Sequence, residues 1–484
     1  MENAVGIRAF DVRWFVGPAL DTVAALLLLP PLFWGVNERD SSLLTDVWAR
    51  QFAALMAAGD PYPRWLPGSF GGLGSPTFIF YPPLTFLPDG LVRLATGPEI
   101  PVSYRLAITA SVLLWASDAS MNWWLRDQVR PGLTLLGAVL FMAAPYHLTD
   151  YYWRGALAEF SSYAVIPIVL LGVRRAARAW SGVLVLAVGY LSLILAHLPA
   201  ALLVTLFLLP AYALHAVCLA QRPVPALVRS LVGGLLGLAL SALYLLPALS
   251  LPGHITTGVF WDSPYFNPNQ CVLLAVLFVS VPPFLWIVCC IALSAAAIAQ
   301  LLWIEEVRLW AGVIAFSLLA LAGAVPLLWS ISLLATVQLR PFRLLGLVEA
   351  AAGIGLILAL QAKSRWGWRQ RLILASSLLA LLPALYFFIV TRADSLADAP
   401  HYWARFTPLI EANMMDGAKY LPPGLTSHQA NSVAGFGPWT APPPLGTTCP
   451  GASCAATRRG QTIEVTVSAS AQVTLAQFAF PVGS

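Results

Sequence analysis

The fold is decided by residues 160–219, which read FSSYAVIPIVLLGVRRAARAWSGVLVLAVGYLSLILAHLPAALLVTLFLLPAYALHAVCL. A transmembrane helix needs about 20 mostly apolar residues, and this stretch holds apolar runs that approach or reach that length. A cluster of arginines, RRAAR at residues 174–178, separates the first two runs and predicts a cytoplasmic loop. The apolar runs are residues 160–173, 183–197 and 200–219. The stretch therefore predicts consecutive membrane spans.

The composition of the whole chain agrees with this prediction. Of its 484 residues, 59% are hydrophobic and only 10% are charged, whereas a soluble domain is about a quarter charged. So few charges exclude a soluble enzyme. The net charge of +5 is small, and no basic stripe lies outside the apolar runs, so no nucleic-acid partner is expected.

The charges beside the apolar runs predict the topology. Arg8 and Arg13 precede the first run, residues 14–36, which places the N-terminus in the cytoplasm. The same rule along the chain gives about eleven spans and two polar loops on the outer side. We expect an all-α polytopic membrane bundle over residues 1–391. The outer loops are residues 37–97 and 149–160.

The C-terminal stretch, residues 392–484, is predicted to form a small β domain outside the membrane. QTIEVTVSA and QVTLAQFAF alternate apolar and polar residues, which is typical of strands. Cys449 and Cys454 lie in a polar segment and would bridge in an oxidising compartment. Other cysteines, such as Cys218, lie in apolar runs and are expected to pack as small hydrophobic residues.

Several charged residues are predicted to lie at the outer ends of the spans, where charge is costly and usually functional. A carboxylate there can accept a proton from an acceptor hydroxyl, and arginines can bind a leaving phosphate. A second carboxylate can hold a divalent metal such as Mg²⁺ or Mn²⁺. Because nucleotide sugars are absent outside the cell, a lipid-carried donor fits this chemistry. The residues are Asp40, Arg154, Glu159, Arg340 and Arg343.

Each of these residues also has a structural interpretation. Asp40 is a good N-cap for a helix that begins near residue 41. Arg154 and Glu159 can form a structural ion pair. The arginines at 340 and 343 can extend to lipid head groups. His197 either packs in the core or lines a cavity.

Neighbouring polar residues have predicted positions as well. Residues 45–58 have helical spacing and are expected to lie on the membrane surface, with Asp46 on the solvated face. The aromatic residues at 147 and 151–153 are typical of an interfacial belt. Glu349 lies inside an apolar run and needs a partner, either Arg343 or a water-lined cavity.

Two stretches resemble a known family. The segment RDSSLLTDVWARQFAALMAAGDPYPRWLPGSFGGLGSPTFIFYPPL resembles the first outer loop of bacterial and archaeal membrane proteins related to 6-pyruvoyl-tetrahydropterin synthase. These proteins in turn resemble the GT-C superfamily of glycosyltransferases. WRGALAEF at residues 153–160 resembles the family's second outer loop, with weaker similarity in AHLPAAL, QLRPFR and KYLPPG. The first segment carries its match on Asp40, Tyr62, Pro63, Arg64, Trp65, Gly71, Gly72, Gly74, Pro76, Phe80, Tyr81, Pro82 and Pro83.

The resemblance implies a GT-C-like bundle with a catalytic aspartate at Asp40 and a second acid at Glu159. It implies a polyprenyl-phosphate sugar donor, inversion at the anomeric carbon and often a divalent metal, which Asp40 and Glu159 would share. The chain departs from the family where relatives often have His-Asp, because Arg39 precedes Asp40 here.

The sequence thus predicts a glycosyltransferase of the bacterial inner membrane that acts on the periplasmic face, with an acceptor of unknown class. Arg340, Arg343 and Arg154 would hold the donor phosphate. The substrate cavity would be lined by Tyr62, Arg64, Tyr81 and His197. Two alternatives remain, a lipid or glycolipid transporter and a non-catalytic envelope scaffold. A continuous polar path from Arg154 to Arg174 would favour the transporter.

Overall fold

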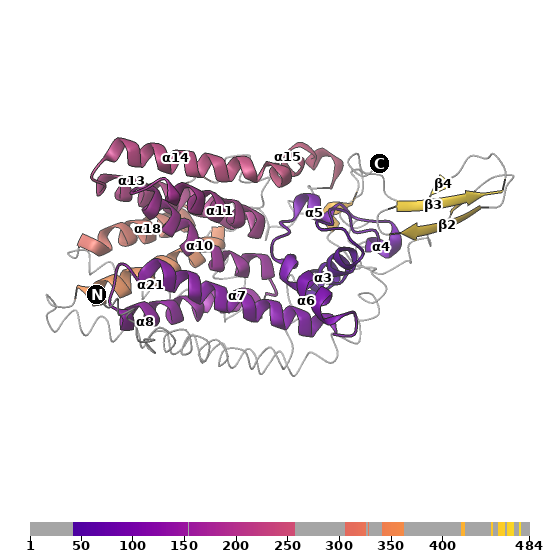
Figure 1. The fold of residues 1–484 in the computed structure, drawn as a ribbon, viewed down its shortest axis with the longest axis horizontal. Helices are drawn as coiled ribbons and strands as arrows, with labels where there is room; N and C mark the ends of the chain where they lie inside the picture. The colour runs from indigo at the N-terminus through magenta and orange to yellow at the C-terminus, as the bar shows by residue number, and fades with distance from the viewer. Residues whose placement is uncertain are drawn as a thin grey trace, which may run out of the picture.

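The fold is described by a computed structural model of the chain (Figure 1). Its described part contains one long helical bundle, a compact segment at one end of that bundle, and short strands. The described residues are 42–152, 154–256, 305–325, 328, 341–362, 418–421, 447–448, 454–459, 462–468 and 474–475.

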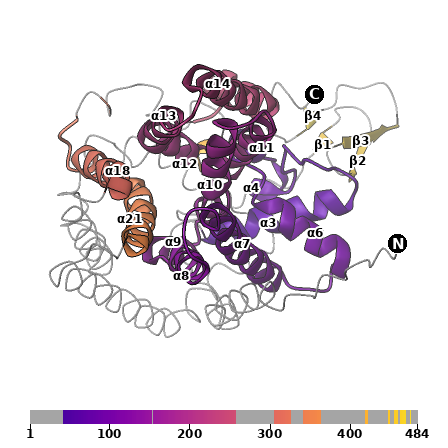
Figure 2. The same ribbon diagram turned by 60° about the vertical axis from the view of Figure 1, so that its left-hand side comes forward.

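The bundle lies with its long axis horizontal in Figure 1. Its helices are α7 (Val102–Leu125), α8 (Pro131–Met142), α9 (Pro145–Tyr152), α10 (Leu157–Ala176), α11 (Ser181–Ala196), α12 (Leu198–Leu203), α13 (Leu209–Cys218), α14 (Pro223–Leu240), α15 (Ala242–Ser250), α18 (Glu305–Leu321) and α21 (Leu344–Gln361). Helices α7, α10, α11 and α14 pack in that order, α8 packs against α7 and α21, and α18 packs against α21 (Figure 2). Short 3₁₀ turns are η2 (Pro252–His254), η4 (Pro341–Arg343) and η6 (Ala418–Tyr420).

Five helical segments among the described residues are long and apolar enough to cross a membrane. Exposed leucines cover the outward face of α14, as expected where a helix meets lipid. The prediction of a helical, membrane-embedded bundle is therefore confirmed. The count of eleven spans stays a prediction, because several predicted spans lie outside the described residues. The five segments are Pro131–Tyr151, Leu157–Ala176, Leu198–Cys218, Pro223–Leu240 and Pro341–Gln361.

Glycines allow the central helices to approach closely. α10 is buried on almost all sides, between α7 and α11. A Cβ at Gly189 of α11 would lie 3.2 Å from Val169 N of α10. A Cβ at Gly237 of α14 would lie 2.7 Å from the carbonyl oxygen of Ala187. Small residues at such crossings maximise van der Waals contact, which holds helices together in lipid.

The helix that follows His197 contains a π-helical turn, η1 (Val204–Leu208), between α12 and α13. Pro210 is the second residue of α13, the regular helix that follows, and has no N–H to donate to the preceding turn. The π-helical turn therefore lies where the backbone hydrogen bond that a residue at position 210 would donate is missing. Thr205 lies inside it, and its hydroxyl donates to the carbonyl of Ala201 at 2.6 Å.

Residues 42–96, which belong to the predicted first outer loop, fold into a compact segment at one end of the bundle, which we call the outer segment (Figure 1). It contains α3 (Ser42–Ala57), α4 (Ser69–Gly72), α5 (Thr77–Phe80) and α6 (Phe86–Thr96). Phe52 packs on Phe78, with ring centroids 4.7 Å apart. Gly74 has φ +86°, and a Cβ there would overlap the Trp65 ring. The glycine-rich motif thus fits a tight turn over a tryptophan.

Two predictions for this segment are wrong. α3 is not a surface helix, because it packs against α6 and α7 and its residues Val47, Trp48 and Phe52 are buried. Asp46 does not face solvent, since only 8% of its surface is exposed. The apolar face of α3 is wide enough to be covered by the rest of the loop, which the sequence pattern alone did not indicate.

The predicted aromatic belt is also wrong where the structure describes it. His147 and Tyr151 are buried, at 0% and 2% exposure, rather than placed at a lipid interface. The rings of His147 and Tyr151 both pack on Phe160 of α10 inside the protein. Cys218 is exposed at the end of α13 instead of packed in the core.

The C-terminal stretch contains two short antiparallel pairs. β2 (Cys454–Arg459) pairs with β3 (Thr462–Val467), and β1 (Thr447–Thr448) pairs with β4 (Thr474–Leu475). Within the alternating segment, Thr462–Val467 form a strand. A complete β domain over 392–484 stays a prediction, because most of that range lies outside the described residues.

Candidate functional site

A cluster of buried charges lies where α9, α10 and η4 meet. Glu159, in the first turn of α10, accepts hydrogen bonds from Arg154 Nη1 at 2.9 Å and from Arg343 Nε at 3.1 Å. The hydroxyl of Tyr146 donates to the same carboxylate at 2.9 Å. We call Asp150, Arg154, Glu159 and Arg343 the charge cluster. The hydrogen bond between Glu159 and Arg343 joins the segment WRGALAEF to the segment QLRPFR. The two bonded residues are 184 positions apart in the sequence.

Asp150 adds a second carboxylate to this charge cluster. It forms an ion pair with Arg154, four residues later. Its other oxygen, Oδ2, is buried without a hydrogen-bond partner among the described residues. The side chain of Arg154 is 3% exposed and that of Arg343 is 13% exposed. Arg343 is therefore the arginine more open to a ligand, whereas Arg154 is enclosed by two carboxylates.

Glu349 of α21 lies next to the cluster but does not pair with Arg343. Its carboxylate accepts from the backbone N–H of Tyr146 at 2.8 Å and from the hydroxyl of Tyr163 at 3.4 Å. Tyr146 therefore bonds to Glu349 through its backbone and to Glu159 through its side chain. The prediction that Arg343 pairs with Glu349 is wrong. The hydrogen-bond donors to the Glu349 carboxylate include the N–H of Tyr146, at the start of α9, and the hydroxyl of Tyr163.

The outer segment, residues 42–96, is bonded to the helix ends beside the charge cluster. The hydroxyl of Thr45 on α3 donates to the carbonyl of Gly155 at 3.0 Å. Thr85 and Ser161 share a hydroxyl hydrogen bond of 2.8 Å. The N–H of Leu84 donates to the carbonyl of Leu195 at 3.0 Å. These bonds fix the FYPPL motif against α10 and α11.

Tyr81 lies in an aromatic group shared with the KYLPPG motif. Its ring is 4.6 Å from that of Trp48, and the ammonium of Lys419 lies 5.9 Å from its centroid. Tyr420 is buried and stacks on Phe80 at 6.3 Å. This arrangement brings Lys419 to the same end of the bundle as the charge cluster.

His197 also lies at this end. It is 5% exposed, and its Nδ1 accepts from the N–H of Ala200, so the ring caps α12. His197 thus has the predicted packing role, and its place in a substrate cavity stays a prediction.

Tyr62 and Arg64 are placed differently. The hydroxyl of Tyr62 donates to the carbonyl of Phe78 at 3.1 Å, and Arg64 donates to the carbonyl of Leu243 at 3.3 Å. The guanidinium of Arg64 lies 4.9 Å from the centroid of the Tyr62 ring. Arg64 therefore joins the outer segment to α15, whereas Tyr62 bonds within that segment, so their hydrogen bonds among the described residues lie away from Glu159.

Burial shifts two acids in the outer segment. Burial raises the pKa of Asp46 to about 6, although Arg50 and Arg105 oppose the shift. Burial also raises the pKa of Asp89 to about 6, against the attraction of Arg105, whose Nε donates to it at 3.0 Å. Both groups lie outside the helices that are long enough to span.

Three predicted residues lie outside the described part of the chain, namely Asp40, Arg340 and Cys449. Cys454 begins β2, and its side chain is likewise not described. Their roles and the disulfide stay predictions. Sequence reasoning did not single out Asp150, Tyr146 or Thr45. Only Asp150 carries a signal in the sequence, the spacing of four residues from Arg154 that pairs charges on a helix.

The described residues do not fit a divalent metal at Glu159. They contain no group of three acidic, histidine or cysteine side chains that is suited to hold one. The carboxylate of Glu159 is already bound by two guanidinium groups and a tyrosine hydroxyl, which oppose a cation at that point. The shared metal with Asp40 stays a prediction, and no step of the reaction below passes through it.

The described residues define a helical protein with five segments long and apolar enough to span a membrane, and with a buried charge cluster beside the outer segment. A comparison with protein-family models finds no match to the chain, and a comparison with curated proteins also finds none. Evidence on function therefore comes from the geometry of the site and the motif segments that meet there.

Proposed function

We propose that the protein is a membrane glycosyltransferase of GT-C type that uses a polyprenyl-phosphate sugar. The observation that carries the proposal is the meeting of distant motif segments at one end of the bundle. Arg343 bonds to Glu159, Thr45 bonds to Gly155, and Lys419 lies over Tyr81. A buried charge at the end of a span is costly, which favours a functional reason for keeping it there.

In the proposed reaction, the hydroxyl oxygen of the acceptor attacks the anomeric carbon of the donor sugar. The bond from that carbon to the phosphate oxygen breaks, and polyprenyl phosphate leaves. The hydroxyl proton passes to a carboxylate, for which Asp40 is the predicted base. Attack opposite the leaving phosphate inverts the anomeric carbon.

Arg343 is the residue that we assign to the leaving phosphate. It is the more open arginine of the charge cluster, and a guanidinium forms paired hydrogen bonds with phosphate. Glu159 then acts as a positioning residue, because it holds Arg343 and Arg154 in place. Lys419, whose ammonium lies over the Tyr81 ring, adds positive charge at the same end of the bundle.

The sequence of α10 supports the transferase better than the transporter. That helix carries the charge cluster at its first turn and Arg174 near its last turn. Residues 164–173 between them read AVIPIVLLGV and contain no polar side chain. A polar path along this helix is therefore interrupted for more than two turns.

The proposed orientation follows from the arginines at the opposite end of the bundle, which would face the cytoplasm. The charge cluster and the C-terminal strands would then face the periplasm of a bacterial inner membrane. Eleven spans and a small periplasmic β domain complete this proposal.

The test uses purified protein in nanodiscs with a panel of polyprenyl-phosphate sugars and follows release of polyprenyl phosphate. A crude cell-envelope extract supplies the acceptor, and Asp40→Asn is run beside the wild type. We expect one donor to be turned over and Asp40→Asn to abolish that turnover. Turnover that survives in Asp40→Asn would refute the assigned base, and no turnover of any donor would refute the proposed activity.

A further inference from the structure

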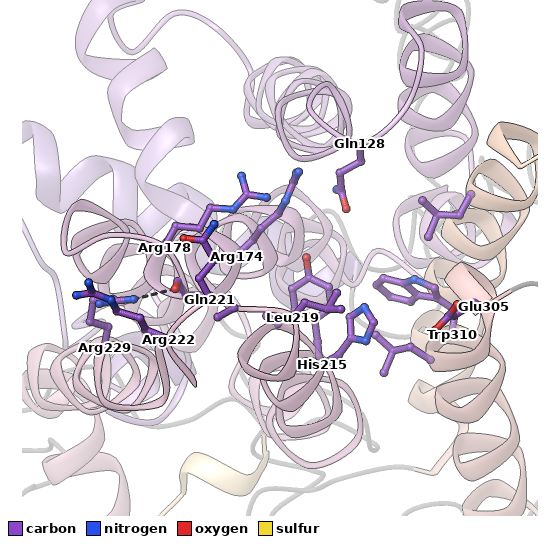
Figure 3. Close-up of a pocket in the computed structure, with 16 residues that line it drawn as sticks. Gln128, Arg174, Arg178, His215, Leu219, Gln221, Arg222, Arg229, Glu305 and Trp310 are labelled. Carbon is purple, nitrogen blue, oxygen red and sulfur yellow. Dashed lines mark hydrogen bonds between the residues drawn. The ribbon is translucent and has the colours of Figure 1, made fainter. Parts of the chain in front are cut away.

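A second polar site lies at the end of the bundle opposite the charge cluster. It is a pocket of about 1180 Å³ between α10, α13, α14, α18 and α21 (Figure 3). Arg174, Arg178 and Gln221 gather on one side of it, and Trp310 and Glu305 lie on the other. The proposed transfer reaction does not use this pocket.

The charge of the pocket lining favours an anion. Its arginines are Arg174, Arg178, Arg222 and Arg229, and Glu305 is its acidic residue. Arg229 is committed to the protein, because it donates to the carbonyls of Ala176 and Ala177 at 2.6 and 2.8 Å. The remaining three arginines still exceed the one carboxylate by two charges.

Arg174 has an unused donor. Its Nη2 donates to the carbonyl of Asp127 at 3.1 Å, whereas its Nη1 is buried without a hydrogen-bond partner among the described residues. Within that part of the chain, the guanidinium groups of Arg178 and Arg222 form no hydrogen bond or ion pair either. A buried unsatisfied donor is unfavourable, and an oxygen-rich anion in the pocket would satisfy it.

The depth of the pocket points to a lipid. It lies where the candidate spans Leu157–Ala176, Leu198–Cys218 and Pro341–Gln361 end, which is the level of lipid head groups. Leu219, Leu309 and Trp310 give it an apolar wall beside the arginines. A basic pocket between spans, with an apolar wall, is complementary to a phosphate that carries acyl chains.

We propose that this pocket binds the phosphate group of an anionic membrane phospholipid. Arg174 and Arg178 bind the phosphate oxygens, and the wall formed by α13 and α18 contacts an acyl chain. The inference does not rest on the proposed transferase activity, because the pocket is at the other end of the bundle and its test needs no turnover.

The experiment measures lipids retained by the purified full-length protein in native mass spectrometry. The protein is offered phosphatidylglycerol or phosphatidylcholine, each with and without millimolar inorganic phosphate. Arg178→Gln is the main variant, since this side chain is exposed, and Arg174→Gln is the second. Arg126→Gln, an arginine at the same end that does not line the pocket, is the control.

We expect wild type and Arg126→Gln to retain phosphatidylglycerol in preference to phosphatidylcholine. Each pocket variant should bind it about tenfold more weakly, as expected for the loss of one charged hydrogen bond. Equal retention by wild type and both pocket variants would overturn the proposal. Displacement of the lipid by inorganic phosphate would overturn the lipid as the ligand and leave a free-phosphate site.

Discussion

Glu159 joins three segments of the chain that are far apart in sequence. Arg154 comes from the second outer loop, Arg343 from the turn before α21, and Tyr146 from the start of α9. Breaking a buried ion pair leaves an uncompensated charge, so such groups depend strongly on one another.

A double-mutant cycle should measure this dependence. We expect Glu159→Gln and Arg343→Met to be coupled by about 1–3 kcal/mol in the free energy of unfolding, since both side chains are largely buried. Denaturation by a harsh detergent, monitored by circular dichroism, gives the four free energies. Arg126 and Asp127 form the control pair, because they are 50% and 53% exposed and should be coupled by less than about 1 kcal/mol. Equal coupling energies for the two pairs would contradict a buried ion pair between Glu159 and Arg343.

At this scale the sequence predicted the charged residues better than their partners. Arg154, Glu159 and Arg343 stood out because charge at the outer end of a span is costly. Asp150 did not stand out, because it belongs to a polar segment that reads as a solvated loop. Glu349 accepts a hydrogen bond from the start of α9 because α9 packs against α21, and no local sequence pattern encodes that packing.

At the scale of elements, α14 offers a matched pair of glycines. A Cβ at Gly237 would lie 2.7 Å from the carbonyl oxygen of Ala187, whereas a Cβ at Gly234 would meet nothing within 4 Å. We expect Gly237→Ala to lower the free energy of unfolding by about 1–3 kcal/mol through overpacking. Gly234→Ala should leave it unchanged or raise it by about 1 kcal/mol, because alanine favours helices. Thermal unfolding in detergent checks both variants, and a similar loss in both would argue against close α11–α14 packing.

The outer segment should depend on pH through Asp46. Its folded pKa of about 6 exceeds the ordinary value of 3.8, so the folded form keeps a proton that the unfolded chain releases. This stabilisation is complete below about pH 4 and is lost as the pH rises through about 6. Relative to wild type, Asp46→Asn should gain up to about 3 kcal/mol in unfolding free energy at neutral pH and little at about pH 4.

The measurement is the difference in melting temperature between Asp46→Asn and wild type across this pH range. Glu99→Gln serves as the control, because Glu99 is an exposed acid of the same segment. A constant difference between Asp46→Asn and wild type at every pH would show that Asp46 is not protonated in the folded protein.

Element positions were predicted well where apolar runs are long, and less well in the outer loop. The helix predicted over residues 45–58 is present as α3, but its burial was missed. An amphipathic pattern shows that one face is apolar and does not show whether lipid or protein covers it. Here the rings of Phe78 and Phe86 cover it.

At the scale of the whole molecule, the proposed orientation places exposed Cys218 at the cytoplasmic end. A variant that keeps Cys218 and has serine at the other cysteine positions should react with a membrane-impermeant maleimide in inverted vesicles. It should not react in intact spheroplasts. Cys218→Ser in the same background is the control for background labelling. Labelling in intact spheroplasts alone would reverse the topology.

The overall class of the molecule follows from its composition, because so few charges permit only a membrane bundle. The site required tertiary information, since Glu159 and Arg343 meet only after α10 and α21 pack around α8 and α9. The pocket at the opposite end was equally hidden. Its arginines were interpreted as topology signals, and nothing in the sequence showed that they surround a common space.

The central claim is that the charge cluster acts on a phosphate-linked sugar, and one measurement tests it most directly. The release of polyprenyl phosphate is compared for wild type, Arg343→Gln and Arg126→Gln, after circular dichroism has shown that all three are folded. The account predicts that Arg343→Gln lowers kcat by about 10²-fold, as for the loss of one donor that stabilises transition-state charge, while Arg126→Gln matches wild type. Equal turnover by folded Arg343→Gln and wild type would contradict it.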